Sequence, residues 1–251
     1  MFNNKPYATV NREERNYCFL FAHALLMSNV IRSRFSALIE KKSGLVLEPN
    51  ALEVYLEAAA LRDYWFDLGD SVIYSAETHE RRRTVLVAVL KKFGLDANIL
   101  DQHDLFWTSP AKQKLWNPNH WNIEALKAAG LDKLKQVKWA FNAKPDLLLM
   151  TPESILVIEA KIESGEGCKA DVEYRQFEIQ KLITELWQLL IPQFQNRKLE
   201  LTLLEVTPTR DTSISWADVI DLISGSEVDE FTRNALDSLK RYYPKTHVAD
   251  L

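Results

Sequence analysis

The stretch from Pro145 to Lys161 reads PDLLLMTPESILVIEAK and carries the strongest fold signal in the chain. Two apolar runs rich in Leu, Ile and Val, residues 145–150 and 154–161, flank the tripeptide Thr-Pro-Glu. Such runs are typical of buried strands, and Pro next to polar residues is typical of a turn. The pattern therefore predicts an antiparallel hairpin.

Three charged side chains lie toward one end of this hairpin. Side chains two apart share a face of a strand, so Glu159 and Lys161 point the same way. A hairpin that turns near its middle places Asp146 roughly opposite them. Burying charges at the end of an apolar strand costs free energy, so such charges are usually paired, exposed to solvent or part of a functional site. The alternative to a functional site is a surface hairpin closed by an ion pair between Glu159 and Lys161.

The three charged residues suit one kind of chemistry. An Asp beside a Glu, with a backbone carbonyl such as that of Ala160, supplies the oxygen ligands that Mg²⁺ or Mn²⁺ prefers. A metal held there polarises a phosphate and lowers the pKa of an attacking water. Lys161 adds a positive charge that stabilises the developing negative charge. The residues therefore predict a metal-dependent centre that cleaves phosphodiester bonds.

The sequence around the hairpin predicts mostly helices before it and a helix followed by a strand after it. Helical spacing of apolar residues predicts helices over residues 11–43, 50–66, 77–93 and 122–135. A strand is predicted over residues 137–142. An acidic loop at 163–171 precedes a predicted helix over 172–191, a strand over 198–208 and helices from residue 215 onward.

PDLLLMTPESILVIEAK resembles the signature of the PD-(D/E)xK nuclease superfamily, the restriction-endonuclease-like fold. That family has an α-β-β-β-α-β core, and the predicted order of elements between residues 11 and 206 is similar. The resemblance implies an α/β protein with a mixed sheet and additional helices. It also implies one nuclease-like domain over residues 1–251, with a helical insertion at about residues 45–135.

The resemblance implies a role for each site residue. Asp146 and Glu159 would bind the metal, and Lys161 would assist the attacking water. The sequence NREERNY resembles the first-helix motif of the family, in which a glutamate points at the metal. Here that residue is Glu14, with Glu13 as the other candidate.

Two glutamines are further candidates. YRQFEIQK resembles the helix after the last catalytic strand, where members often place a polar residue near the site. Gln176 and Gln180 lie one turn apart on that helix. The alternative is an ordinary solvated helix face.

The charge balance limits how the chain meets nucleic acid. A net charge of −4 argues against a protein that coats nucleic acid nonspecifically, because such binding needs many cationic contacts. An enzyme that cuts needs only local basic patches, and the candidates are Arg81, Arg82, Arg83, Lys112 and Lys114. For each patch the alternative is a solvated helix face.

These observations favour a Mg²⁺-dependent deoxyribonuclease that acts in restriction or other defence against foreign DNA. The alternatives are a module that keeps the fold and binds nucleic acid without cleaving it, and a protein-interaction module. The sequence does not distinguish DNA from RNA as the substrate. It also leaves the oligomeric state open, although cleavage of both strands by an enzyme with one active site commonly requires a homodimer. The apolar runs are too short to cross a bilayer, and the first residues lack the apolar segment of a signal peptide, so a cytoplasmic location and no membrane partner are expected.

Overall fold

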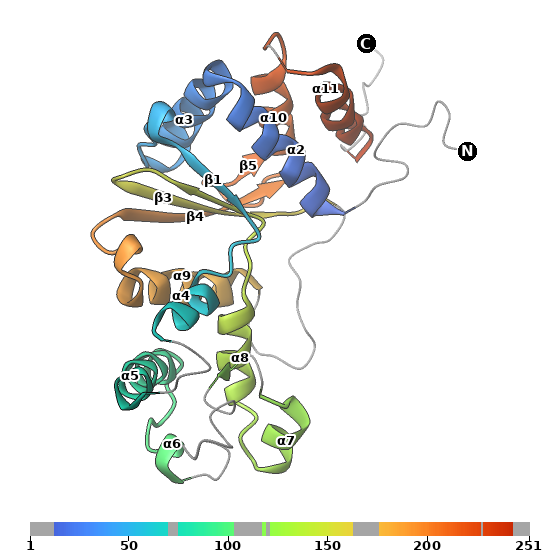
Figure 1. Ribbon diagram of the computed structural model, residues 1–251. Helices are drawn as coiled ribbons and strands as arrows, with labels where there is room; N and C mark the ends of the chain where they lie inside the picture. Colours follow the sequence, from blue (N-terminus) through green and yellow to red (C-terminus); the bar gives the residue numbers. More distant parts are fainter. Residues whose placement is uncertain are drawn as a thin grey trace. The chain divides into compact units, whose positions relative to one another are not determined.

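The computed structural model describes residues 13–69, 75–102, 117–118, 121–162, 176–226 and 228–242. The chain divides into two compact units (Figure 1). The first takes in Met1–Ala58, Pro145–Gln176 and Asn196–Leu251, and the second takes in Ala59–Lys144 and Phe177–Gln195. The expectation of one domain with a helical insertion stays a prediction.

The first unit holds a mixed sheet, which makes the chain an α/β protein. In the described residues the sheet has five strands, which lie in the order of the chain: β1 (Glu53–Leu56), β2 (Leu147–Met150), β3 (Ser154–Ala160), β4 (Lys198–Glu205) and β5 (Ile214–Ser215). β1 and β2 are antiparallel, as are β2 and β3. β3 and β4 are parallel, as are β4 and β5. The predicted hairpin is confirmed as β2 and β3.

Helices cover one face of this sheet (Figure 1). They are α2 (Glu14–Met27), α3 (Asn29–Ser43), α10 (Trp216–Ile223) and α11 (Glu230–Asp237), with the short helices η1 (Pro49–Ala51) and η6 (Ser238–Tyr242) in the same unit. Leu156, Ile158 and Ala160 of β3 belong to the same buried cluster as Phe21 and Phe35 of the helices. Because side chains alternate along a strand, the other residues of β3, Glu159 among them, point to the opposite face of the sheet.

The second unit is helical in its described residues. Its helices are α4 (Ala60–Asp67), α5 (Ala76–Lys92), α6 (Ile99–Gln102), α7 (Ile123–Ala128), α8 (Leu134–Asn142), α9 (Gln176–Leu190) and η5 (Pro192–Phe194). The first residue of α9, Gln176, is assigned to the first unit. The Trp65 and Phe141 rings meet edge to face at 5.2 Å and join α4 to α8. The buried Trp187 packs against Phe194 in the same way at 5.6 Å.

Two predicted elements are wrong. The sequence predicts one helix over residues 50–66, but these residues form η1, the strand β1 and the helix α4. β1 pairs along its length with β2, and this pairing outweighs the helix-favouring residues around it. The strand predicted over residues 137–142 lies instead in the helix α8. The strand that precedes the hairpin is therefore β1, which lies some 80 residues earlier in the chain than the predicted strand.

Other predicted elements are confirmed with changed ends. The predicted helix over 11–43 is two helices, because the chain leaves the helical conformation at Ser28, whose hydroxyl accepts a hydrogen bond from the Ile31 amide. The predicted helix over 122–135 ends early, and Gly130 takes a left-handed conformation with φ 72° between α7 and α8. The helix 77–93, the helix 172–191 and the strand 198–208 correspond to α5, α9 and β4.

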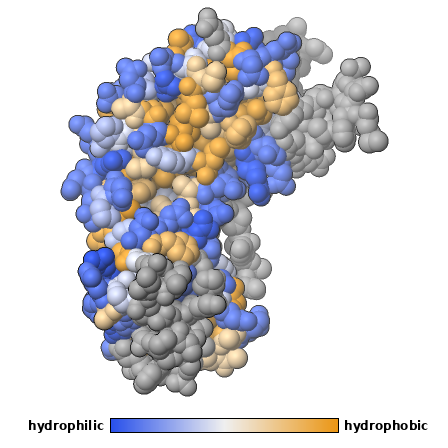
Figure 2. Space-filling model, viewed as in Figure 1, coloured by the Kyte–Doolittle hydropathy of each residue, from blue (hydrophilic) through white to orange (hydrophobic). Residues whose placement is uncertain are grey.

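Some apolar side chains of the first unit face solvent. Figure 2 shows apolar residues gathered on the face over α2 and β1. The exposed large hydrophobic side chains of these elements include Phe19 and Leu26 of α2 and Tyr55 of β1. Within the part of the chain that the structure describes, no helix is long and apolar enough to span a membrane.

The contrast between buried and exposed leucines gives a test of this core. Leu149 on β2 is fully buried in the cluster beneath α2, whereas Leu26 on α2 is 55% exposed. We expect Leu149→Ala to lower the free energy of unfolding by about 2–5 kcal/mol, because it leaves a cavity in the core. Leu26→Ala, the matched control, should change it by less than about 0.5 kcal/mol. Urea unfolding followed by circular dichroism measures both, and equal effects would contradict the described core.

Candidate functional site

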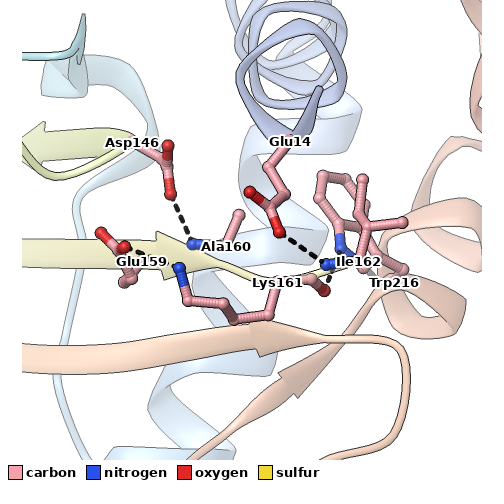
Figure 3. A network of polar contacts seen from close by, with 7 residues as sticks. All are labelled: Glu14, Asp146, Glu159, Ala160, Lys161, Ile162 and Trp216. Atoms are coloured by element: carbon pink, nitrogen blue, oxygen red, sulfur yellow. Dashed lines mark hydrogen bonds and ion pairs between the residues drawn. The ribbon is translucent and has the colours of Figure 1, made fainter. Parts of the chain in front are cut away.

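The pairing of β2 with β3 brings Asp146 and Glu159 together. Leu147 lies opposite Ile158, and one step further along the same register Asp146 lies opposite Glu159. The Ala160 amide donates a hydrogen bond of 2.7 Å to Asp146 Oδ2 (Figure 3). A side-chain carboxylate therefore takes the place of a backbone acceptor at this end of the hairpin. The predicted placement of Asp146 beside Glu159 is confirmed.

Lys161 forms an ion pair inside this site. Its Nζ lies 2.8 Å from Glu159 Oε1 (Figure 3). The two side chains are only 13% and 7% exposed, so the alternative of a surface ion pair does not describe them. A buried ion pair is a poor source of net stability because both charges lose their hydration. This cost favours a functional reason for the pair.

Backbone hydrogen bonds fix the chain just past β3. The Lys161 amide donates to the carbonyl oxygen of Leu204 at 2.7 Å, and the Lys161 carbonyl accepts from Trp216 Nε1 at 3.3 Å. Glu14 Oε1 accepts from the Ile162 amide at 3.2 Å (Figure 3). The base of the Lys161 side chain is therefore held between β4, α10 and α2.

Glu14 approaches the site from the first helix, as predicted, and Glu13 does not. Glu13 is the residue that precedes α2, and its side chain is exposed and pairs with Arg15 at 3.6 Å. The N-terminal end of α2 thus points one glutamate inward and one outward.

Burial and neighbouring charges shift the pKa values of the site. Burial, then the charge of Glu159, raises the pKa of Asp146 to about 7, against the opposing effects of the Ala160 amide and Lys161. Burial alone would lower the pKa of Lys161, but Glu159, Glu14 and Asp146 raise it above its ordinary value. Two carboxyl groups therefore repel each other beside an ammonium group that stays charged at neutral pH.

The donor set fits a hard divalent cation. Asp146 and Glu159 offer carboxylate oxygens, and a cation between them would relieve the repulsion that raises the pKa of Asp146. Among the described residues, no group of three or more His, Cys, Asp or Glu side chains is disposed to hold a metal ion. Direct ligation by Glu14 and by the Ala160 carbonyl therefore stays a prediction.

The predicted glutamines lie at the start of α9. The side chain of Gln176 lies outside the described residues, and Gln180 is buried within a helix that continues into the second unit. For Gln180 the alternative of a solvated helix face is wrong. The role of both glutamines near the metal stays a prediction.

The predicted basic patch on α5 needs correction. The guanidinium of Arg82 is buried over the Trp65 ring, 5.4 Å from its centroid, and donates to the Gly69 carbonyl at 2.9 Å. Consecutive helical residues point in different directions, so Arg82 faces the interior while Arg81 is exposed and pairs with Glu77. Arg82 is therefore a packing residue. Arg81 and Arg83 remain candidates, and Lys112 and Lys114 lie outside the described residues.

Sequence reasoning missed Glu57, which lies next to Asp146 in the sheet. Leu56 of β1 pairs with Leu147, and one step further the Glu57 amide donates to the Asp146 carbonyl at 3.4 Å. Glu57 has φ 47°, a left-handed conformation that costs a residue with a side chain about 1–2 kcal/mol. No local signal marked Glu57, because the sequence around it favours a helix.

Sequence reasoning also missed the contact that Trp216, the first residue of α10, makes with the site. It is fully buried, and its ring packs edge to face against Tyr17 at a centroid distance of 6.1 Å. Its indole nitrogen, however, reaches the Lys161 carbonyl, as described above. No sequence pattern could have found that contact, because the two residues are 55 positions apart.

Comparison of the chain with models of protein families, with curated proteins and with solved structures finds no match in any of the three. The case for a function therefore depends on the geometry of Asp146, Glu159 and Lys161.

The raised pKa of Asp146 predicts a pH-dependent stability. The pKa rises from 3.8 to about 7 on folding, so between these values the folded protein holds a proton that the unfolded chain has released. The contribution of this group to stability is therefore greatest below about pH 4. It falls as the pH rises from there to about pH 7, and it stays low at higher pH.

We expect Asp146→Asn to raise the melting temperature of the metal-free protein at pH 8 and to change it little at pH 4, since Asn carries no charge at either pH. Thermal unfolding in EDTA at the two pH values measures this. Asp237→Asn, at an exposed acid of the same unit, is the control. An equal gain at both pH values would show that charge repulsion is not the cause.

Proposed function

We propose that this chain is a metal-dependent nuclease that hydrolyses phosphodiester bonds in DNA with Mg²⁺ or Mn²⁺. The observation that carries the proposal is the close placement of Asp146, Glu159 and Lys161 at the end of the buried strand β3. Two oxygen ligands and one ammonium group are what a metal-assisted attack on a phosphate requires.

The order of elements supports a restriction-endonuclease-like core. Helices α2 and α3 precede β1, β2 and β3, and α9 lies between β3 and its parallel partner β4. If the helices α4 to α8, which lie between β1 and β2, are an insertion, this order is similar to the α-β-β-β-α-β order that the resemblance implies. The first-helix glutamate of that pattern corresponds to Glu14, which contacts the chain directly after β3.

Each residue has a separate task in the proposed reaction. Asp146 and Glu159 would hold the ion, which when bound polarises the phosphate and makes a water more acidic. The ordinary pKa of Lys161 already lies above neutral pH and the neighbouring carboxylates raise it further, so its charged ammonium suits charge stabilisation better than proton abstraction. Its ammonium would orient the water and stabilise the charge that develops on the phosphate oxygens. Glu14 and Trp216 would keep the Lys161 backbone in place.

The division of tasks predicts different failures of single mutants. Asp146→Ala and Glu159→Ala should weaken Mg²⁺ binding and abolish nicking of plasmid DNA together, because each removes a metal ligand. Lys161→Ala should bind Mg²⁺ as well as the wild type or slightly better, and yet lose activity by a factor of about 100 to 1000. Titration calorimetry with Mg²⁺, alongside a nicking assay with and without EDTA, measures both quantities.

Asp237→Ala removes an exposed acid of the same unit and serves as the control for both assays. If the wild type binds DNA but no metal condition yields cleavage, the chain is a binding module and the nuclease proposal fails. If Lys161→Ala keeps full activity with Mg²⁺, the lysine is structural and the proposed division of tasks is wrong. The expected role in defence against foreign DNA and the possible homodimer stay predictions.

A further inference from the structure

The candidate site carries more negative than positive charge in its described residues. Lys161 is buried against Glu159. The acidic residues at or next to the site are Glu14, Glu57, Asp146 and Glu159. DNA is a polyanion, so its backbone approaches such a surface only where cations meet the phosphates.

Arg15 is an exposed cation that flanks this site. It directly follows Glu14 on α2, and its side chain is 63% exposed. Its Nη1 lies 3.7 Å from Glu57 Oε1, and its Nε lies 3.6 Å from Glu13 Oε2. Ion pairs as exposed as these contribute little to stability, so a stronger anionic ligand displaces them easily.

Glu57 is held in an uncommon conformation beside the site. Glu57 lies one residue past the end of β1 and Asp146 one residue before β2, and continued registers place them in one row with Glu159 of β3. The left-handed backbone of Glu57, with φ 47°, is one that few residues with a side chain adopt. Such strain clusters at functional sites, where surrounding contacts hold it in place. Here the contacts are the hydrogen bond to Asp146 and the ion pair with Arg15.

We propose that Arg15 binds a backbone phosphate of the DNA substrate, and that Glu57 holds its guanidinium beside the site until the phosphate takes the place of the carboxylate. The inference rests on the proposed nuclease function. A guanidinium binds phosphate through two parallel hydrogen bonds and stays charged at every relevant pH. The exchange of one anion for another leaves the Arg15 charge paired in both states.

Removing the two partners should change DNA affinity in opposite directions. The probe is a fluorescein-labelled 20-base-pair duplex, bound in Mg²⁺ by the full chain carrying Lys161→Ala, in which cleavage is slow. Arg15→Gln should weaken binding several-fold and reduce the slope of log K against log salt by about 0.9, the value for one phosphate contact. Glu57→Gln should tighten binding by about 2- to 5-fold, because it removes an exposed competing carboxylate. Fluorescence anisotropy over a range of salt concentrations measures both effects.

Two further comparisons separate exchange from a general charge effect. The gain in DNA affinity from Glu57→Gln should disappear when Arg15→Gln is also present. Residue 57 and the phosphate then no longer compete for the Arg15 guanidinium. Lys240→Gln and Asp237→Asn change a similarly exposed ion pair of the same unit and should alter binding by less than about 1.5-fold. A second duplex of unrelated sequence should show the same losses, because phosphate contacts do not read bases.

The outcomes distinguish this inference from the nuclease proposal. If the parent protein binds the duplex and the wild type cleaves DNA, but Arg15→Gln leaves the salt slope unchanged, the role of Arg15 is wrong and the nuclease function stands. An equal gain from Glu57→Gln with and without Arg15 would also overturn the exchange. If the wild type neither binds nor cuts DNA, the proposed function fails and this inference fails with it.

Discussion

The register of β2 against β3 is the constraint on which the site depends. A slip of one residue would turn every side chain of β2 to the other face of the sheet and separate Asp146 from Glu159. Both ends of the hairpin resist such a slip. At the turn, the Thr151 amide donates to the Ser154 carbonyl at 2.8 Å and the Thr151 hydroxyl accepts from the Ser154 amide at 3.1 Å. At the other end, Asp146 accepts from the Ala160 amide. The carboxylate that would bind the metal therefore also fixes the register that positions it.

The hairpin and its charged end could be predicted because their signals are local. The apolar run of β3 is typical of a strand that is buried on both faces, and all seven of its residues are buried in the structure. Glu159 is the one charged residue in that run. The errors arose where a short window carries two patterns. In α8, Leu134, Val137 and Phe141 are buried at helical spacing, but residues 137–142 taken alone alternate loosely like a strand. β1 has only four residues, and its identity as a strand comes from pairing with a segment more than 90 positions away.

The candidate site was predictable in its centre and not at its edges. Asp146, Glu159 and Lys161 follow from one stretch of 17 residues in which the charges end an apolar run. Glu57 depends on where β1 begins, and Trp216 on how α10 packs, so neither follows from the local sequence. Arg82 shows the reverse difficulty: three consecutive arginines suggest one surface patch, but on a helix the middle one points elsewhere and is buried over Trp65. Composition shows which charges are present, and only packing decides which of them meet solvent.

The path of the chain between the two units has a consequence for synthesis on the ribosome. The second unit is built from two separate segments, and the strands of the sheet lie on both sides of each. β3 is completed at residue 160 and β4 at residue 205, and at about 5–20 residues per second this interval is roughly 2–9 s. During that time β3 has made its pairing with β2 at most, and one side of its backbone lacks the partner that β4 later supplies. An apolar strand with an open edge invites pairing with other chains. The nascent protein is therefore most prone to aggregate in the interval before β4 is made.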